Sequence, residues 1–229
     1  TLPLDTEVGG GALLRDVKKV GVMSGGALEL IPRPGILGHL LYGALGKCVS
    51  AADGAGYKHT FTLGANQFAA PYYTLRSAPG NLWGEQFQDV RVSALNIAFR
   101  GADFVRGNVA FVGGLPTKVA TTLWSPATKV DGGPPLIAPL STIELPTGAA
   151  AKVIAGSFMA GMAIPMEEQW IVGSYSPDDF EIISRAFSLS FTMKVTDATL
   201  YSKMMYDANG GSAWAADMLR EADIKLELA

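Results

Sequence analysis

Cysteine and histidine are nearly absent from this chain of 229 residues, which has one cysteine and two histidines. The single thiol, Cys48, excludes an internal disulfide and any metal cluster built on cysteines. Cys48 follows an apolar helical pattern and has apolar neighbours, so we expect a buried, inert thiol in a chain made in a reducing cytoplasm. His39 and His59 have no third ligand at a supportive spacing. The sequence therefore predicts two structural histidines and no metal site.

Charged residues are scarce as well, at 17% of the chain, whereas soluble domains typically have roughly 25%. A low charge density suggests that much of the surface is covered, either by a membrane or by other copies of the chain. The longest weakly charged apolar stretch, 153–166, is too short for the roughly 20 residues of a membrane-spanning helix. The formal net charge of −3 argues against tight binding of nucleic acid, because affinity for phosphates requires basic residues.

Sequence patterns that carry enzyme chemistry are missing too. Ser24 and Ser157 each lie beside a glycine but lack the spacing of a nucleophile elbow, and no glycine-rich loop has the form that binds phosphates. The paired acids Glu167-Glu168 and Asp178-Asp179 lie close to prolines, so we expect solvated carboxylates in loops. We predict a protein that is not an enzyme and has no catalytic residues and no cofactor.

What the sequence does contain is a series of strand patterns around a short helix. Apolar residues at helical spacing over 36–45, between Pro34 and Gly46, predict a helix with a proline start and a glycine stop. Strands are predicted at 17–31 (broken by a glycine pair), 57–63, 72–76, 83–88, 90–99 and 104–112. The last two form a hairpin, and a change of apolar phase near Ala94 indicates a bulge.

The second half of the chain repeats the order strand, helix, strand. Residues 186–195 alternate, with apolar side chains expected inward and Ser188, Ser190, Thr192 and Lys194 outward. A helix capped by Asp197 is expected over 200–205, and a last strand over 222–228. We predict an N-terminal arm or loop over 1–16 and a single mainly β domain over 17–229, with a long loop or linker at 113–140.

Three blocks carry a resemblance to a known family. They are 38–46 with 57–62, then 92–99 turning through 101–104 into 109–113, and finally 187–191 followed by Leu200-Tyr201. In the order of these blocks the chain resembles the tail tube (major tail) proteins of long-tailed bacteriophages, the siphophages. The resemblance covers most of the chain.

The resemblance implies a β-sandwich or half-barrel with one or two short flanking α-helices, the tail tube fold. It also implies a structural virion protein, made in the host cytoplasm, that assembles into stacked hexameric rings. The hollow tube would let double-stranded DNA pass, with tape measure, tail terminator and distal tail proteins as further partners and no membrane. The alternative is a monomeric β-sandwich module, carbohydrate-binding or baseplate-associated. Convergent, exposed tryptophans and tyrosines would favour that module, and the tryptophans to inspect are Trp83, Trp124, Trp170 and Trp214.

A tube subunit must pair its strand edges with neighbouring copies, and 186–195 suits this role because it alternates and is almost uncharged. The segments 1–16 and 113–140 are expected to reach across to other copies. The bore must not hold DNA, so we expect the residues that line it to be mostly Ser, Thr, Asn, Gln, Asp and Glu.

Overall fold

The structure is a computed structural model. It describes residues 2–3, 17–18, 20–54, 56–65, 69–79, 82–120, 132–144, 152–194 and 225–228. In this part of the chain the fold is mainly β, with antiparallel sheets and one α-helix, which confirms the predicted fold class. None of the described helices is long and apolar enough to cross a membrane.

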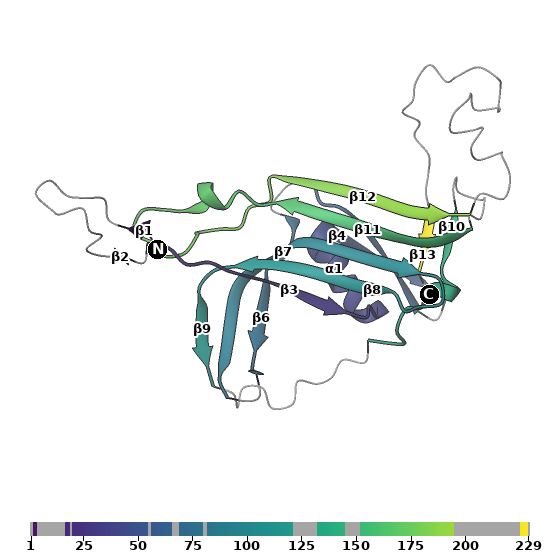
Figure 1. Ribbon diagram of the computed structural model, residues 1–229, viewed down its shortest axis with the longest axis horizontal. Helices are drawn as coiled ribbons and strands as arrows, with labels where there is room; N and C mark the ends of the chain where they lie inside the picture. The colour runs from purple at the N-terminus through teal and green to yellow at the C-terminus, as the bar shows by residue number, and fades with distance from the viewer. Residues whose placement is uncertain are drawn as a thin grey trace, which may run out of the picture.

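The largest sheet has seven strands (Figure 1). Its main path runs in the order β12, β11, β7, β8, β3, and all neighbouring strands are antiparallel. These strands are β3 (Ser24–Leu30), β7 (Gly84–Arg100), β8 (Arg106–Gly113), β11 (Val153–Ala163) and β12 (Ser184–Met193). Two shorter strands, β6 (Tyr73–Ser77) and β9 (Pro116–Val119), pair with the first part of β7.

Strand β7 is continuous over 17 residues, where the sequence predicted two separate strands. Asp89 connects its two parts with a φ of 53°, in the left-handed region that aspartate tolerates better than most residues. The part before Asp89 turns away from the main path together with β6 and β9 (Figure 1). The bulge predicted near Ala94 is confirmed, because the register with β8 shifts between Val92 and Ala94.

The helix α1 (Pro34–Leu45) begins and ends where the sequence predicts. A proline occupies its first turn, and Gly46 follows with a φ of 87° while its N–H bonds to the carbonyl of Tyr42. The helix turns Leu40, Gly43 and Ala44 inward. A Cβ on Gly43 would lie 2.8 Å from both the Tyr73 hydroxyl and a Val92 methyl, so only glycine allows this close approach to the sheet.

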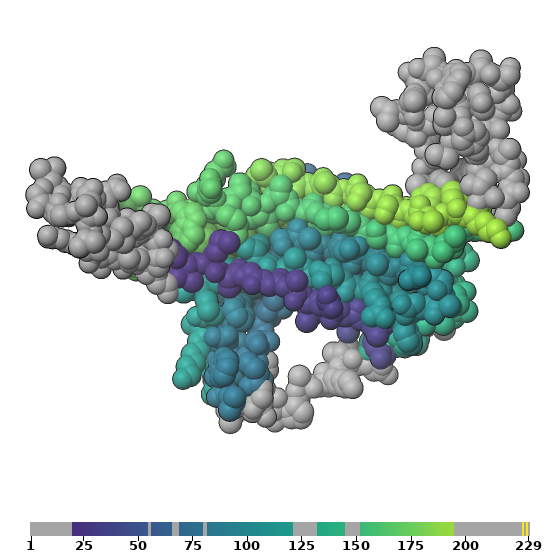
Figure 2. Space-filling model, in the orientation of Figure 1, coloured from purple at the N-terminus to yellow at the C-terminus, as the bar shows by residue number. Residues whose placement is uncertain are grey.

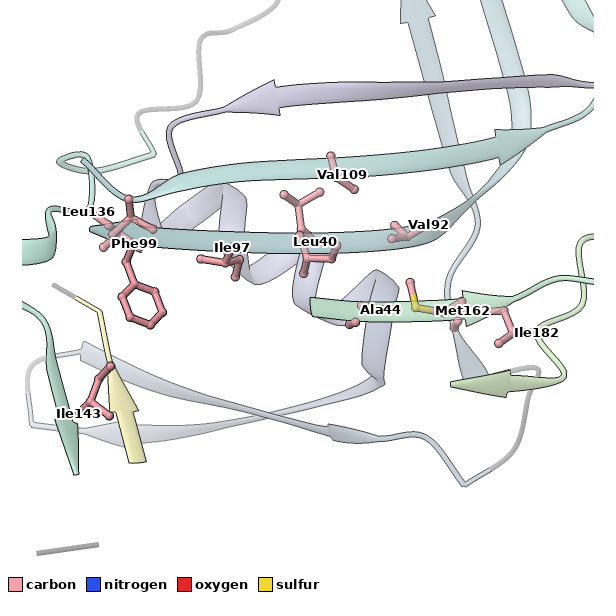
Figure 3. Packing of buried hydrophobic residues seen from close by; sticks show 14 residues of the cluster. Leu40, Ala44, Val92, Ile97, Phe99, Val109, Leu136, Ile143, Met162 and Ile182 are labelled. Carbon is pink, nitrogen blue, oxygen red and sulfur yellow. The ribbon is translucent and has the colours of Figure 1, made fainter. Parts of the chain in front are cut away.

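The hydrophobic core lies between α1 and one face of the main sheet (Figure 3). Alternate residues of the strands point toward the helix, as the period of two in a strand requires. The buried sheet residues on this side are Leu95, Ile97 and Phe99 from β7, Val109 from β8, and Ala160 and Met162 from β11. Burial of each large apolar side chain contributes about 1.5–3 kcal/mol. The core therefore fixes which face of the sheet the helix covers.

A hairpin of β4 (Gly46–Asp53) and β5 (Gly56–Leu63) follows the helix directly. The strand predicted at 57–63 is confirmed, but its side chains are exposed except for Phe61, which is half-buried. Cys48 is also exposed, so the prediction of a buried thiol was wrong. Apolar neighbours along the chain do not bury a residue when the hairpin that holds it packs mainly against α1.

The remaining elements are short. β1 (Leu2–Pro3) pairs with β2 (Val17–Lys18), and β10 (Thr142–Glu144) pairs with β13 (Lys225–Glu227). The described residues also include the 3-10 helices η4 (Ala138–Leu140) and η5 (Met166–Gln169). The predicted loop at 113–140 contains β9 and η4. The glycine pair in β3 does not interrupt that strand. The helix predicted after Asp197 lies outside the described residues.

Candidate assembly interface

The main path of the sheet ends in two edge strands within the described part of the chain, and the short strands β6 and β9, which each pair only with β7, form further edges. Strand β12 pairs only with β11, and strand β3 pairs only with β8. They form opposite margins of the sheet, β12 yellow-green and β3 purple (Figure 2). An edge strand presents a row of backbone N–H and C=O groups that can pair with another strand. Neither edge contains proline, and the charged residues within them are Glu29 in β3 and Arg185 in β12.

Apolar side chains accompany both edges on the side of the sheet that faces α1. Leu28 on β3 is 56% exposed, and Phe187 on β12 is 40% exposed. The Phe187 ring stacks on Phe158 of β11 with 6.4 Å between ring centroids. Beside β12 lies an open apolar cavity with a volume of about 660 Å³. Its lining includes Leu37, Leu41, Leu189 and Leu226. The core is thus left open at the β12 edge.

The other face of the sheet is lined mostly by small or uncharged side chains. The strand register places Ser188, Met159, Asn96, Asn108 and Glu29 in one row across the five strands. The neighbouring row is Ala186, Gly161, Ala94, Ala110 and Ala27. The hydroxyls of Ser157 and Ser190 lie 3.0 Å apart on the same face. We call this surface the open face. Ser188, Ser190 and Thr192 are exposed, as the alternation in the sequence predicts.

Charges on the open face lie toward one end of the strands. Arg100 is the last residue of β7 and Arg106 is the first residue of β8. Arg106 forms an ion pair of 3.5 Å with Asp103 in the turn between them. The middle of the face holds hydroxyl, amide and methyl groups, so it offers little charge for holding a polyanion.

The comparison with protein families agrees with this geometry. A family described as phage tail tube protein matches residues 4–226, which is nearly the whole chain. This chain belongs to that family. No curated protein matches the sequence. Membership in a structural family makes this tail tube protein a non-enzymatic component of a phage tail, as the sequence predicted.

The histidines of this tail tube protein lie on separate elements. His39 is exposed on α1, where its carbonyl accepts a hydrogen bond from the Tyr73 hydroxyl. His59 lies on β5, and its Nδ1 is 2.7 Å from the Ser50 hydroxyl of β4. Within the described residues, no three His, Cys, Asp or Glu side chains come together as metal ligands.

The paired acids lie in the connection between β11 and β12, as the prediction of loop carboxylates requires. Glu167, Glu168 and Asp178 are exposed. Asp179 is half-buried and has a structural role, since it accepts hydrogen bonds from the Tyr72 hydroxyl and from the Phe180 N–H. Sequence reasoning did not find this role, because Tyr72 and Asp179 are far apart in the chain.

The two described tryptophans lie on different elements. Trp83 precedes β7 and is 45% exposed. Trp170 is half-buried beside Gly21, where an added Cβ would lie 2.5 Å from the indole ring. The other two candidates, Trp124 and Trp214, lie outside the described residues.

Proposed function

We propose that this protein is the major tail tube subunit of a long-tailed siphophage. Six copies would join into a ring, and rings would stack into the hollow conduit through which double-stranded DNA leaves the virion. The observation that carries the proposal is the pair of free edges, β12 and β3, at opposite margins of one sheet. Pairing of β12 in one copy with β3 in the next is a head-to-tail contact, which closes into a ring when the rotation between copies closes.

The apolar residues at the edges support this pairing. Leu28 and Phe187 both lie on the α1 side of the sheet, so joining the two edges would bring them onto the same side. The neighbouring copy would then cover the cavity beside β12 and complete the core. Both side chains are well exposed in the single copy, and covering each would contribute about 25 cal/mol for every Å² of apolar surface removed from water.

The open face would line the bore, with α1 on the outside of the ring. Its Ser and Asn side chains fit the expected lining, and its Ala and Gly residues make the surface smoother than expected. Each phosphate neutralised by a basic side chain strengthens binding to DNA. A bore without basic side chains along most of its length would let DNA slide through.

The proposal places the protein in the virion tail after synthesis in the host cytoplasm. Other copies of the chain are its main partners. The further partners are a tape measure protein inside the tube and the tail terminator and distal tail proteins at its ends.

Negative-stain microscopy of the purified protein over a range of concentrations tests the proposal. We expect rings or tubes of uniform width. Ser188→Lys on β12 or Ala27→Lys on β3 should abolish them, because a lysine on an edge strand opposes pairing with another strand. Thr74→Lys on β6 is the matched control, since it adds the same charge to an exposed position outside both edges. Compact single particles at every concentration would refute ring assembly.

A further inference from the structure

The two ends of the main sheet differ in charge, and this difference bears on how rings stack. The inference rests on the proposed function: if the edges β12 and β3 close the ring, the strand ends form its two rims. One rim contains the connection 164–183, which joins β11 to β12. The other contains the turn between β7 and β8, the start of β11 and the end of β12. Figure 1 shows these ends at the left and the right of the sheet.

The connection 164–183 is acidic. It carries Glu167, Glu168, Asp178, Asp179 and Glu181 and contains no lysine or arginine. Two basic side chains of the adjoining strands are withdrawn from the surface: Arg91 is 1% exposed, and Arg185 at the start of β12 is half-buried. We call this end of the sheet the acidic end.

The opposite end is basic. Arg100 ends β7, Arg106 begins β8, Lys152 precedes β11 and Lys194 follows β12. All four side chains are exposed. The N–H of Lys194 bonds to the carbonyl of Lys152 at 2.8 Å, which places these two residues side by side. Asp103, which pairs with Arg106, and Glu144 of β10 offset part of this charge. We call this the basic end.

Both ends also expose apolar side chains. At the acidic end, Ile171, Val172 and Tyr175 are exposed, and Val172 is fully so. We call residues 171–175 the tip. At the basic end there is a hollow of about 160 Å³, lined in part by Phe99, Ile143, Val153 and Ile154. Leu140 and Ile154 beside it are exposed as well. An exposed apolar tip and an apolar hollow are typical of contact surfaces.

We propose that the acidic end of one copy docks on the basic end of a copy in the next ring, with the 171–175 tip seated at the hollow between β10 and the start of β11. The occupant of the hollow is thus a second copy of this chain. The opposite charges of the two ends favour this arrangement over contact between two like ends, which would bring like charges together. Because the two surfaces lie at opposite ends of one molecule, the contact repeats without closing and extends a filament.

Charge reversal tests the electrostatic part of the proposal. Glu167→Lys, Glu168→Lys and Asp178→Lys together replace three of the five acids and reverse the sign of the acidic end. This variant should leave rings but prevent tubes, and so should Lys152→Glu with Lys194→Glu. Mixing the two variants should restore stacking, because each then presents one surface that is opposite in charge to a surface on its partner. Arg76→Glu with Lys118→Glu, on β6 and β9, is the control with the same charge change as the basic-end variant and should form tubes. Reversed variants that stack as the unchanged protein does would overturn the proposal.

Engineered cysteines test whether the 171–175 tip of one copy lies at the hollow of a copy in the next ring. Val172→Cys combined with Ile154→Cys, or with Leu140→Cys, is made in a Cys48→Ser background. Ile154 is at the start of β11, and Val172 lies in the connection that follows the other end of this strand. The strand alone spans about 30 Å from Ile154 to Ala163 at ~3.3 Å per residue, so a disulfide between positions 154 and 172 can form only between copies. Oxidation of assembled tubes should give a ladder of linked multimers for at least one of the two pairs. Val172→Cys alone should give no ladder.

The outcomes separate this inference from the proposed function. Tubes that form normally but show no ladder with either pair would overturn the docking geometry and leave the tube function intact. Failure of the unchanged protein to form any ring would instead refute the proposed function. Raising the salt concentration should shorten tubes before it dissolves rings, because screening weakens contacts between exposed charges.

Discussion

The guanidinium of Arg91 lies over the ring of Tyr72, with 3.9 Å between Arg91 Cζ and the ring centroid. Arg91 is 1% exposed, and its Nη1 donates a hydrogen bond of 3.1 Å to the Ala70 carbonyl. The Tyr72 hydroxyl donates in turn to Asp179. This chain of contacts joins β7, the segment before β6 and the connection 164–183, so it holds the acidic end against the sheet.

Two substitutions of Arg91 separate its packing from its charge. Nε and Nη2 of Arg91 are buried without a hydrogen-bond partner among the described residues. Arg91→Met keeps most of the volume and removes these donors, so we expect a stability within about 1 kcal/mol of the unchanged protein. Arg91→Ala leaves a cavity and should lose about 2–4 kcal/mol. Chemical unfolding of the unassembled subunit measures both values. Equal losses for the two variants would show that the charge, and not the volume, stabilises this corner.

Two glycines of β11 offer a matched pair for testing the contact between strand and core. A Cβ on Gly156 would lie 2.5 Å from the Phe99 ring and 2.8 Å from the Ser190 carbonyl, whereas the nearest atom to a Cβ on Gly161 is 4.0 Å away. Gly156→Ala should therefore destabilise the subunit by about 1–3 kcal/mol through overpacking. Gly161→Ala should be neutral or slightly stabilising. Thermal unfolding of both variants measures this difference in stability. Similar melting temperatures would contradict the packing described for Phe99.

The helix α1 provides a second matched pair. A Cβ on Gly38 would meet only the end of the Phe61 side chain at 3.4 Å, but on Gly43 it would meet Tyr73 and Val92 at 2.8 Å. Replacing glycine by alanine inside a helix gains up to about 1 kcal/mol. We expect that gain for Gly38→Ala and a net loss for Gly43→Ala, measured by urea unfolding. A stabilised Gly43→Ala variant would mean that the helix can move away from the sheet at little cost.

The ionisation of Tyr73 makes the stability of the subunit depend on pH in the alkaline range. Burial raises the pKa of the Tyr73 hydroxyl from 10.0 to about 12. Because the folded state holds this proton more tightly than the unfolded state, its contribution to stability is complete below pH 10 and is lost as the pH rises toward 12. Tyr73→Phe should remove this part of the pH dependence and also the hydrogen bond to the His39 carbonyl. Unfolding curves between pH 9 and pH 12 for both proteins, together with titration of tyrosine absorbance, would reveal the difference.

Local sequence patterns predicted the helix and strands well, but they did not predict which of these elements are buried and which are exposed. The helix at 34–45 and the bulge near Ala94 follow from spacing alone, and both were predicted. Exposure was not predictable in the same way, because the hairpin of Cys48 and the edge strand β12 have apolar patterns but little cover in a single copy. A pattern shows that a face is apolar, and it does not show whether the same chain or another copy covers it.

The charge difference between the two ends of the sheet could not be predicted from the sequence either, because it depends on the order of the strands. The acidic connection 164–183 is visible in the sequence, but Arg100, Lys152 and Lys194 are far apart along it. They meet only because β7, β11 and β12 are adjacent and antiparallel, which brings the end of β7 beside the start of β11. Strand order depends on contacts between distant residues, and a single sequence does not reveal them.

Lysines on the open face should convert a passive bore into one that retains DNA. Asn96 and Asn108 lie opposite each other on β7 and β8, so Asn96→Lys with Asn108→Lys adds two positive charges per subunit to the proposed lining. Thr74→Lys with Thr117→Lys adds the same charge to β6 and β9, outside the open face. Charges on a concave surface converge on a DNA duplex inside it, whereas charges on an outer surface diverge. We therefore expect assembled tubes of the first variant to retain short duplex DNA in sedimentation, with a steep loss of binding as salt rises. Equal retention by the two variants would show that the open face does not line the bore.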